Sequence, residues 1–302
     1  MPPTAQTAFY KGFALLGGAQ YPILGWNFNA DPQRNLPAPL GNWGQYNWSE
    51  GFIRPFINLN LLVRDWDTAQ ASVLSSTFLD PFFTRSADAA HDTTAITNGL
   101  VLWNGRAGWT CAGVKPEAFT ISGGKGEPVT MSASFCAAEV TRLLVAPSLT
   151  AWSATAPVTF KGVNFTNELA DRVQRFNLSY SNNHTPDMTL NGKYGPAAWN
   201  AGMWTSGLQV TVQEADADAL AGYFSTDGTT MVGGLNDVTD VSLVINGQNA
   251  HAAALTLALN NLLVQNPNSN ATQQPRLLRD ISLTVRPATG QGCPLTKTSS
   301  TF

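Results

Sequence analysis

The stretch 207–224 reads GLQVTVQEADADALAGYF, and its hydrophobic period changes in the middle. Leu208, Val210 and Val212 alternate with polar residues, which is the pattern of a β-strand with one buried face. From Ala217 onward the apolar residues recur at the spacing of a helix face. Acidic residues stand beside the first of them, where they favour the first helical turn. The stretch therefore predicts a strand that leads directly into a short helix.

The same transition occurs about 150 residues earlier in the chain. The segment 58–65, NLNLLVRD, ends another alternating strand. Apolar residues at helical spacing follow it and predict a helix from Asp65 to Leu79. Acidic pairs mark both transitions: Asp65 and Asp67 in the first, Asp216 and Asp218 in the second. We therefore expect an internal duplication.

Each half of the chain presents the same features in the same order. An alternating strand precedes a long loop with aromatic residues, the strand-to-helix transition, an Asn-Gly pair typical of a tight hairpin turn, and a final alternating strand. The loops are 31–47 and 182–200, and the Asn-Gly pairs are 104–105 and 246–247. We therefore predict a mainly β protein with two tandem β-sandwich or β-barrel domains, each with one short flanking α-helix and a long loop between early strands.

The predicted boundaries follow from these features and from the proline- and glycine-rich segments between them. They give an N-terminal arm, a first β domain, a linker, a second β domain and a C-terminal tail, at 1–20, 21–140, 141–160, 161–290 and 291–302. We expect the tail to be disordered and the residues 265–275 to form a polar turn.

The charge content of the chain is low. Only 12% of the 302 residues are charged, against ~25% in a typical soluble domain. The net charge is −3; residues 1–150 carry −1 and residues 151–302 carry −2, and neither half contains a basic block. Tight electrostatic binding of nucleic acid is therefore not expected. An amide-rich exterior with few charges suits a surface covered by neighbouring molecules, and an unusually polar monomer is the alternative.

The three cysteines, Cys111, Cys136 and Cys293, do not make a disulfide framework. We expect buried, reduced thiols, with a Cys111–Cys136 pair as the alternative. The N-terminal residues show no basic leader before an apolar run, and no window of ~18–20 apolar residues could span a membrane. Neither a signal peptide nor a membrane partner is expected.

No arrangement of residues indicates catalysis. His91, His184 and His251 lie far apart in the sequence, with no carboxylate or second histidine at ligand spacing, so no metal site is expected. The GGKG segment at 123–126 lacks the spacing of a phosphate-binding loop and predicts a hairpin turn. We therefore expect no enzyme activity, no catalytic residue and no cofactor.

The order of these features resembles that of the tail tube proteins of tailed bacteriophages. The resemblance is carried by two strand pairs, 26–28 with 52–63 and 176–180 with 207–213, each with its long loop and one short helix after it. Tail tube proteins share a β-sandwich with a flanking helix and a long loop between early strands. Some long-tailed phages fuse two copies of this domain in one chain, and the resemblance extends over residues 20–290.

This resemblance implies a structural virion protein, the major tail tube subunit, made in the cytoplasm of a bacterial host. Fused chains of this kind form trimeric rings with pseudo-sixfold symmetry, and the rings stack into a tube that conducts the genome. The implied partners are further copies of the chain, other tail proteins, and DNA in transient, non-specific passage. A near-neutral to acidic lumen would let DNA pass without holding it.

The two long loops are the predicted contact sites. They would reach the next ring and bury aromatic anchors there, namely Trp43, Tyr46, Trp48, Tyr194 and Trp199. Two alternative functions remain open. One is a tandem β-sandwich that binds carbohydrate or a receptor through Trp43, Trp48, Trp199 and Trp204. The other is a different virion component, such as a distal tail or capsid decoration protein.

Overall fold

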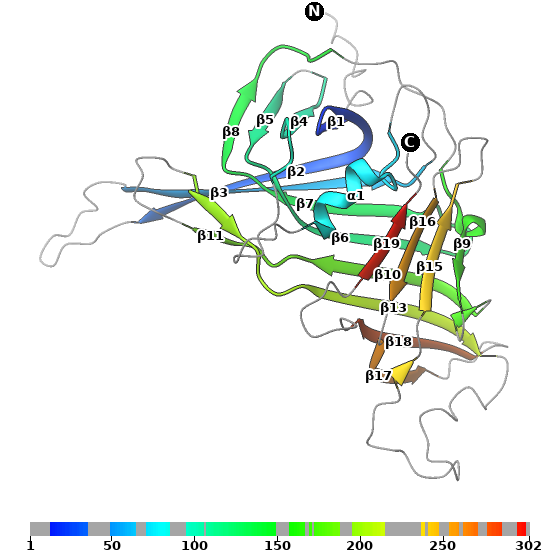
Figure 1. The fold of residues 1–302 in the computed structure, drawn as a ribbon. Coiled ribbons are helices and arrows are strands. Elements are labelled where there is room, and N and C mark those ends of the chain that lie inside the picture. Colours follow the sequence, from blue (N-terminus) through cyan, green and yellow to red (C-terminus); the bar gives the residue numbers. More distant parts are fainter. Residues whose placement is uncertain are drawn as a thin grey trace, which may run out of the picture.

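The structure is a computed structural model of the chain. It describes residues 13–35, 49–64, 71–84, 95–105, 107–148, 157–166, 169–170, 172–187, 195–214, 237–238, 241–247, 254–259, 262–270, 277–285 and 295–299. Strands make up 65% of the structure, and the described residues include one short α-helix. The protein is therefore mainly β and is built from several antiparallel sheets (Figure 1).

The first half of the chain forms β1 to β8 and the helix α1. Their bounds are β1 (Phe13–Leu16), β2 (Ala19–Asn35), β3 (Ser49–Leu62), α1 (Ser76–Phe83), β4 (Leu100–Trp103), β5 (Gly108–Ala112), β6 (Lys115–Gly124), β7 (Thr130–Cys136) and β8 (Glu139–Leu143). Four of these strands pair in the order β2-β3-β7-β6. The other four pair in the order β1-β4-β5-β8, and β1 also pairs with the start of β2.

The second half forms β9 to β19 after a short 3-10 helix at Phe160–Gly162. Their bounds are β9 (Val163–Phe165), β10 (Val173–Ser181), β11 (Thr185–Asp187), β12 (Ala198–Asn200), β13 (Thr205–Glu214), β14 (Asp237–Val238), β15 (Val241–Asn246), β16 (Ala254–Leu259), β17 (Leu262–Asn270), β18 (Leu277–Val285) and β19 (Leu295–Ser299). Four pair in the order β10-β13-β18-β17, and four in the order β9-β15-β16-β19. β11 and β12 form a separate two-stranded ribbon.

The two halves repeat one pattern of strand pairing. Taken in chain order and without β11, β12 and β14, the strands β9 to β19 correspond one by one to β1 to β8. The set β2-β3-β7-β6 then matches β10-β13-β18-β17, and β1-β4-β5-β8 matches β9-β15-β16-β19. Every pairing within a set of the first half thus has its counterpart in the second.

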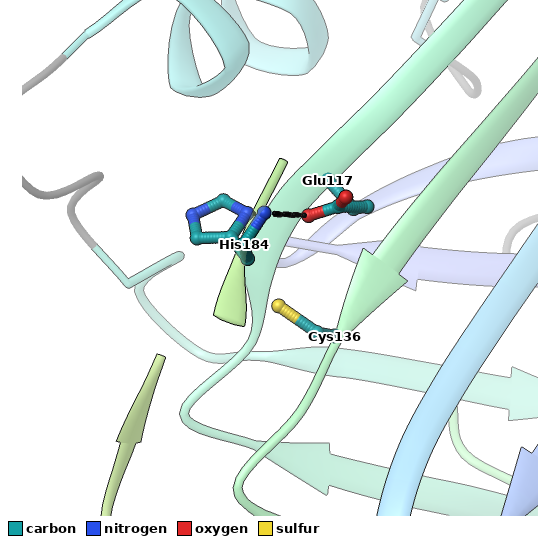
Figure 2. Close-up of side chains that lie close together, drawn as sticks. All are labelled: Glu117, Cys136 and His184. Carbon is teal, nitrogen blue, oxygen red and sulfur yellow. Dashed lines mark hydrogen bonds and ion pairs between the residues drawn. The ribbon is translucent and has the colours of Figure 1, made fainter. Parts of the chain in front are cut away.

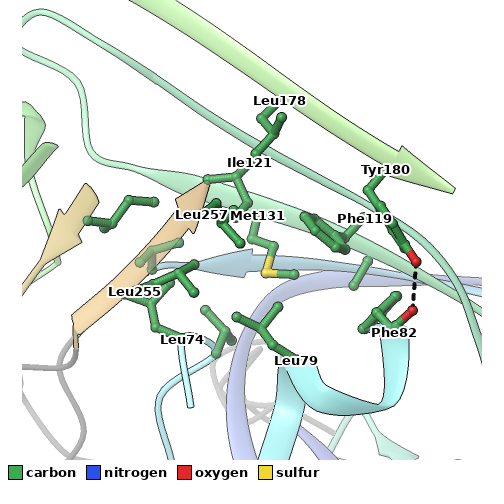
Figure 3. Close-up of a cluster of buried hydrophobic side chains, with 14 of the residues drawn as sticks. Leu74, Leu79, Phe82, Phe119, Ile121, Met131, Leu178, Tyr180, Leu255 and Leu257 are labelled. Carbon is green, nitrogen blue, oxygen red and sulfur yellow. Dashed lines mark hydrogen bonds between the residues drawn. The ribbon is translucent and has the colours of Figure 1, made fainter. Parts of the chain in front are cut away.

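One continuous sheet joins the halves, because β6 pairs with β10. The sheet β9-β15-β16-β19 and helix α1 pack on one face of this main sheet (Figure 1). Figure 3 shows side chains of β6, β7, β10, α1 and β16 meeting in the core, among them Phe82, Phe119, Ile121, Met131, Leu178, Tyr180, Leu255 and Leu257. The hydrophobic core therefore extends from one half into the other.

The predicted strands and hairpin turns are confirmed where their patterns were strongest. Leu208, Val210 and Val212 of β13 are buried, as their alternation requires. The turn between β4 and β5 contains Asn104, whose side-chain oxygen accepts a hydrogen bond from the Ala107 N–H at 3.0 Å. β15 and β16 also pair antiparallel, but Asn246 belongs to β15 and stands opposite Ala254, so the connection is longer than the tight turn predicted at 246–247, and its residues 248–253 lie outside the described residues.

The helix begins later than predicted. α1 spans Ser76–Phe83 and has no acidic residue in its first turn, so a helix over 65–79 is wrong. Residues 71–75 are not helical, and a turn at 73–75 precedes the helix. The hydroxyl of Ser72 donates a hydrogen bond to the Arg64 carbonyl (2.7 Å) and accepts one from the Leu74 N–H (3.2 Å), and such local bonds compete with helix formation. The second predicted helix, from Asp216 to Phe224, lies outside the described residues.

Several predicted loops and tails contain strands. These are β1 in the N-terminal arm, the end of β2 in the loop 31–47, β11 and β12 in the loop 182–200, β8 at the start of the linker, the end of β17 in the polar turn 265–275, and β19 in the C-terminal tail. β19 is an example of the cause. Its polar sequence gives no clear alternation, yet it completes the edge of β16 and buries Leu295.

Candidate functional site

β6 of the first half pairs with β10 of the second half, and we call this pairing the joint. The two strands pair antiparallel from Gly124 opposite Arg175 to Ala118 opposite Ser181. Gly123 is buried in this joint, and a Cβ on it would lie 2.9 Å from the ring of Phe176. A glycine at this position thus lets the aromatic ring of one half pack directly on the backbone of the other.

The side chain of Asn182 connects three elements at the end of the joint. Its amide group donates to the carbonyls of Phe82 in α1 (3.2 Å) and of Pro116 in β6 (2.9 Å). Its oxygen accepts from the Trp204 indole N–H (2.8 Å). The Tyr180 hydroxyl lies within hydrogen-bond distance of this oxygen (3.1 Å) and of the Phe82 carbonyl (2.9 Å), and its single proton is shared between them. Because Asn182 is fully buried, these bonds lock the helix of the first half onto the first long strand of the second.

The segment after β10 folds back over the first half. The indole N–H of Trp199 donates to the carbonyl of Ala137 at 3.0 Å, and the Trp199 ring meets Phe56 edge to face at 5.2 Å between centroids. The ammonium group of Lys115 donates to the Trp199 carbonyl at 2.7 Å. Trp199 is 1% exposed, so its side chain is buried within its own chain.

The strands that correspond to the joint lie at open edges. β2 corresponds to β10, and β1 covers its outer edge only from Ala19 to Pro22. β17 corresponds to β6, and β14 covers its outer edge only at Leu262 and Leu263. Beyond these short contacts, no strand in the described part of the chain pairs with either edge. Backbone N–H and C=O groups at such edges are ready to pair with another strand.

The face of the main sheet opposite the core is polar and nearly uncharged. One row across neighbouring strands consists of Asn60, Ser132, Thr120 and Ser179, which stand opposite one another in the register. A second row contains Thr130, Ser122, Asn177, Gln209 and Ser282. The residues between them along each strand are buried in the core, so the hydroxyl and amide groups form the outer surface.

Two contacts on this face involve charged side chains. Arg175 lies 3.3 Å from Glu127, and both side chains are more than half exposed. The carboxylate of Asp280 accepts a hydrogen bond from the Thr211 hydroxyl at 2.5 Å. Neither contact creates a large field of one sign, so this face has little electrostatic preference for a charged ligand.

A buried cluster of polar side chains lies beside the joint (Figure 2). His184 follows β10, and both its Nδ1 (2.6 Å) and its backbone N–H (3.0 Å) contact Oε2 of Glu117 in β6. The thiol of Cys136 in β7 lies in the same cluster, and the ligand atoms of the three residues are within 4.8 Å of one another. Burial raises the pKa of the Cys136 thiol well above its usual range, and the charge of Glu117 adds to this rise.

The prediction that every histidine stands apart from carboxylates is wrong for His184. The signal that could have revealed its contact is the register of β6 and β10, which sequence alone did not provide. Of the cysteines, Cys111 and Cys136 are both free and buried, so the expectation of reduced thiols holds for them and a disulfide between them is excluded.

The predicted contact residues fall into two groups. Trp43, Tyr46, Trp48 and Tyr194 lie outside the described residues. Trp199 is buried within its own chain and is not an exposed loop residue; its contact with another subunit stays an untested prediction. Trp204, considered as a sugar platform, donates its indole N–H to Asn182. The described residues thus give Trp199 and Trp204 structural roles.

No protein-family model matches the chain, and a search of curated proteins finds no similar sequence. Among the described residues, no helix has the length and apolar character needed to cross a membrane.

Proposed function

We propose that the chain is a self-assembling structural subunit, the major tail tube protein of a tailed bacteriophage. The observation that carries this proposal is the joint between β6 and β10. It links two halves with the same strand pairings, and within the described residues the corresponding strands, β17 and β2, each have an outer edge that is only partly paired. In the assembly, β17 of one chain pairs with β2 of the next, as β6 pairs with β10 inside the chain.

Such a contact is head to tail, since the two surfaces that meet are different. Head-to-tail contacts generate closed rings when the rotation between neighbours closes. Each chain supplies two β-sandwich or β-barrel modules, and three chains would give a ring with pseudo-sixfold symmetry, as the resemblance to fused tail tube proteins implies. Ring closure would also remove the exposed edges, which are otherwise sites of uncontrolled association.

The polar face of the main sheet supports a lumen that conducts DNA. The other face is covered by α1 and by the sheet β9-β15-β16-β19, so the polar face is the one left to line a channel. Its Asn, Ser, Thr and Gln side chains carry no net charge. A phosphate backbone would find neither a row of cations to hold it nor a strong negative field to repel it.

Electron microscopy of the purified full-length chain tests the proposal. At high protein concentration we expect rings or stacked tubes with a central channel. Protein that remains monomeric at all concentrations, in the presence and absence of other tail proteins, would contradict it.

Cross-linking tests the proposed joint separately. Asn27→Cys on the exposed face of β2 is combined with single cysteines at each position 264–270 of β17, in a Cys293→Ser background. Oxidation should give covalent oligomers at alternate positions, because successive side chains of a strand point to opposite faces. Asn58→Cys on β3 is the control, since β3 is paired on both sides. Rings without any such cross-link would mean that other surfaces form the joint.

A further inference from the structure

The cluster of Glu117, Cys136 and His184 has features that the proposed assembly does not require. Its three residues come from β6, from β7 and from the segment directly after β10 (Figure 2). The His184 side chain is fully buried, that of Glu117 is 17% exposed, and Cys136 is fully buried. Within the described residues, this is the one group of three histidine, cysteine and acidic side chains whose ligand atoms come together.

We propose that Glu117, Cys136 and His184 bind a divalent transition metal ion of the zinc class at the joint between the two halves of the chain. A thiolate, a carboxylate and an imidazole are the three donor types that zinc takes from proteins. With a neutral imidazole, the two negative ligands balance the charge of a divalent ion. The loaded site would be electrically neutral, which suits a buried position.

The geometry requires only local adjustment. Ligand atoms of a tetrahedral zinc site lie roughly 3.3–3.7 Å apart, given bonds of about 2.0–2.3 Å. The three ligand atoms already lie within 4.8 Å of one another, so Cys136 would move inward. The contact of 2.6 Å between His184 Nδ1 and Glu117 Oε2 would open as the metal replaces the shared proton. A water molecule or a further side chain would complete the fourth position.

The ion would connect the two halves of the chain, because its ligands come from both. Glu117 and Cys136 belong to the first half and His184 to the second, so metal binding requires the β6–β10 joint to be formed. A ligand that binds only the folded chain stabilises it in proportion to the logarithm of its concentration above Kd. The proposed site therefore couples metal availability to the integrity of the joint.

The competing interpretation is a hydrogen-bonded Glu117–His184 pair beside a buried thiol. The ammonium group of Lys115 donates to the Trp199 carbonyl and places a positive charge near Cys136. This charge would repel a metal cation and favours the competing interpretation. Metal binding to the wild-type chain decides between the two interpretations.

The test uses the full-length chain, treated with a chelator and then titrated with Co²⁺ and Zn²⁺. We expect one Co²⁺ per chain with a thiolate-to-cobalt charge-transfer band, loss of that band when Zn²⁺ displaces Co²⁺, and a higher thermal midpoint with Zn²⁺ that the chelator reverses. A wild-type chain that shows no band and no stoichiometric Zn²⁺ would overturn the proposal. This readout does not depend on whether rings form.

Variants assign the ligands. Cys136→Ser should abolish the charge-transfer band, and His184→Gln and Glu117→Gln should each weaken the affinity for Zn²⁺ by more than about 100-fold. Cys111→Ser is the matched control, because Cys111 is also free and buried but does not belong to the cluster; it should keep the band. Circular dichroism shows whether each variant is folded. A band that survives in folded Cys136→Ser would place the metal elsewhere.

Discussion

The two halves of the chain differ most in the segment after their first long strand. In the second half, β10 ends at Ser181, and the segment after it forms the ribbon β11–β12 and packs on the first half through Trp199. In the first half, β2 and β3 continue together as far as Asn35 opposite Ser49 and project away from the rest of the molecule (Figure 1). One segment is packed on its own chain, while the strands of the other extend outward.

This difference indicates what a neighbouring chain would supply. If β17 of one chain pairs with β2 of the next, the hairpin β2–β3 meets the second half of that neighbour. It would occupy the place that the ribbon β11–β12 occupies on the first half. We therefore expect the loop 31–47 to make contacts within a ring, in addition to the ring-to-ring contacts that its length suggested.

The largest expected effect comes from removing the tryptophan that anchors the second segment. Trp199→Ala should lower the free energy of unfolding by about 4 kcal/mol, since it removes a fully buried indole and leaves the Ala137 carbonyl without this donor. Urea denaturation of the monomer measures this loss.

Trp43→Ala, in the corresponding segment of the first half, is the matched variant. It should leave the monomer within about 0.5 kcal/mol of wild type and impair assembly, as seen by sedimentation. A Trp43→Ala chain that unfolds would instead assign Trp43 to the core of its own half.

The next effect tests the lock between α1 and β10. Asn182→Ala should lower the free energy of unfolding by about 3 kcal/mol, because it removes the hydrogen bonds of a fully buried amide and leaves the Trp204 N–H and the Pro116 carbonyl without this partner. The exposed Asn27→Ala on β2 is the control and should change stability by less than about 0.5 kcal/mol. Equal effects in denaturant would show that Asn182 does not hold the joint.

Ionisation of Tyr21, in the first half, should lower the free energy of unfolding by about 2 kcal/mol at alkaline pH. Burial raises the pKa of Tyr21 to about 12, from 10.0 in water. The neutral phenol is therefore favoured in the folded state, so its stabilising contribution is complete below pH 10 and is lost as the pH rises from 10 to 12. Two pKa units correspond to at most about 2.7 kcal/mol. Tyr21→Phe should flatten this part of the stability profile, and an unchanged slope would contradict the assignment.

The smallest expected effect compares a glycine of the closed joint with one of the open edge. Gly123→Ala should cost about 1.5 kcal/mol, because the new methyl group would press on the Phe176 ring. Gly25→Ala on β2 meets no atom within 4 Å and should leave the monomer within about 0.5 kcal/mol. Thermal unfolding of the two variants would distinguish them, and a larger loss for Gly25→Ala would reverse the comparison.

Sequence reasoning succeeded where local chemistry determines structure. Alternating apolar residues identified β13 and β7, and the Asn-Gly pair at 104–105 identified the hairpin of β4 and β5, because burial and turn geometry act over a few residues. It failed for β19 and for the start of α1. A strand that pairs along a sheet edge, such as β19, needs little hydrophobic alternation of its own. Before α1, the hydroxyl of Ser72 bonds the Arg64 carbonyl and the Leu74 N–H, and these bonds compete with helical hydrogen bonds.

Local sequence patterns could not predict the β6–β10 joint or the polar cluster of Glu117, Cys136 and His184 beside it. Glu117 and His184 are 67 residues apart, and only the register of β6 against β10 brings them together. Trp199 is likewise buried by residues far from it in the sequence, Phe56 and Ala137, which a loop rich in Pro and Gly gave no reason to expect. Pairing between distant edges depends on the whole tertiary arrangement, so it carries no signature in either strand alone.

If the chains form the proposed ring, the β6–β10 joint has a kinetic consequence, because it forms within a single chain. In a closed ring of such chains, every second contact between modules is a β6–β10 joint inside one chain. Only the other contacts, between different chains, depend on encounters in solution. The rate of ring nucleation should then rise with a lower power of subunit concentration than it would for unlinked single modules. Under the proposed assembly, two linked halves would favour complete rings when the subunit is scarce.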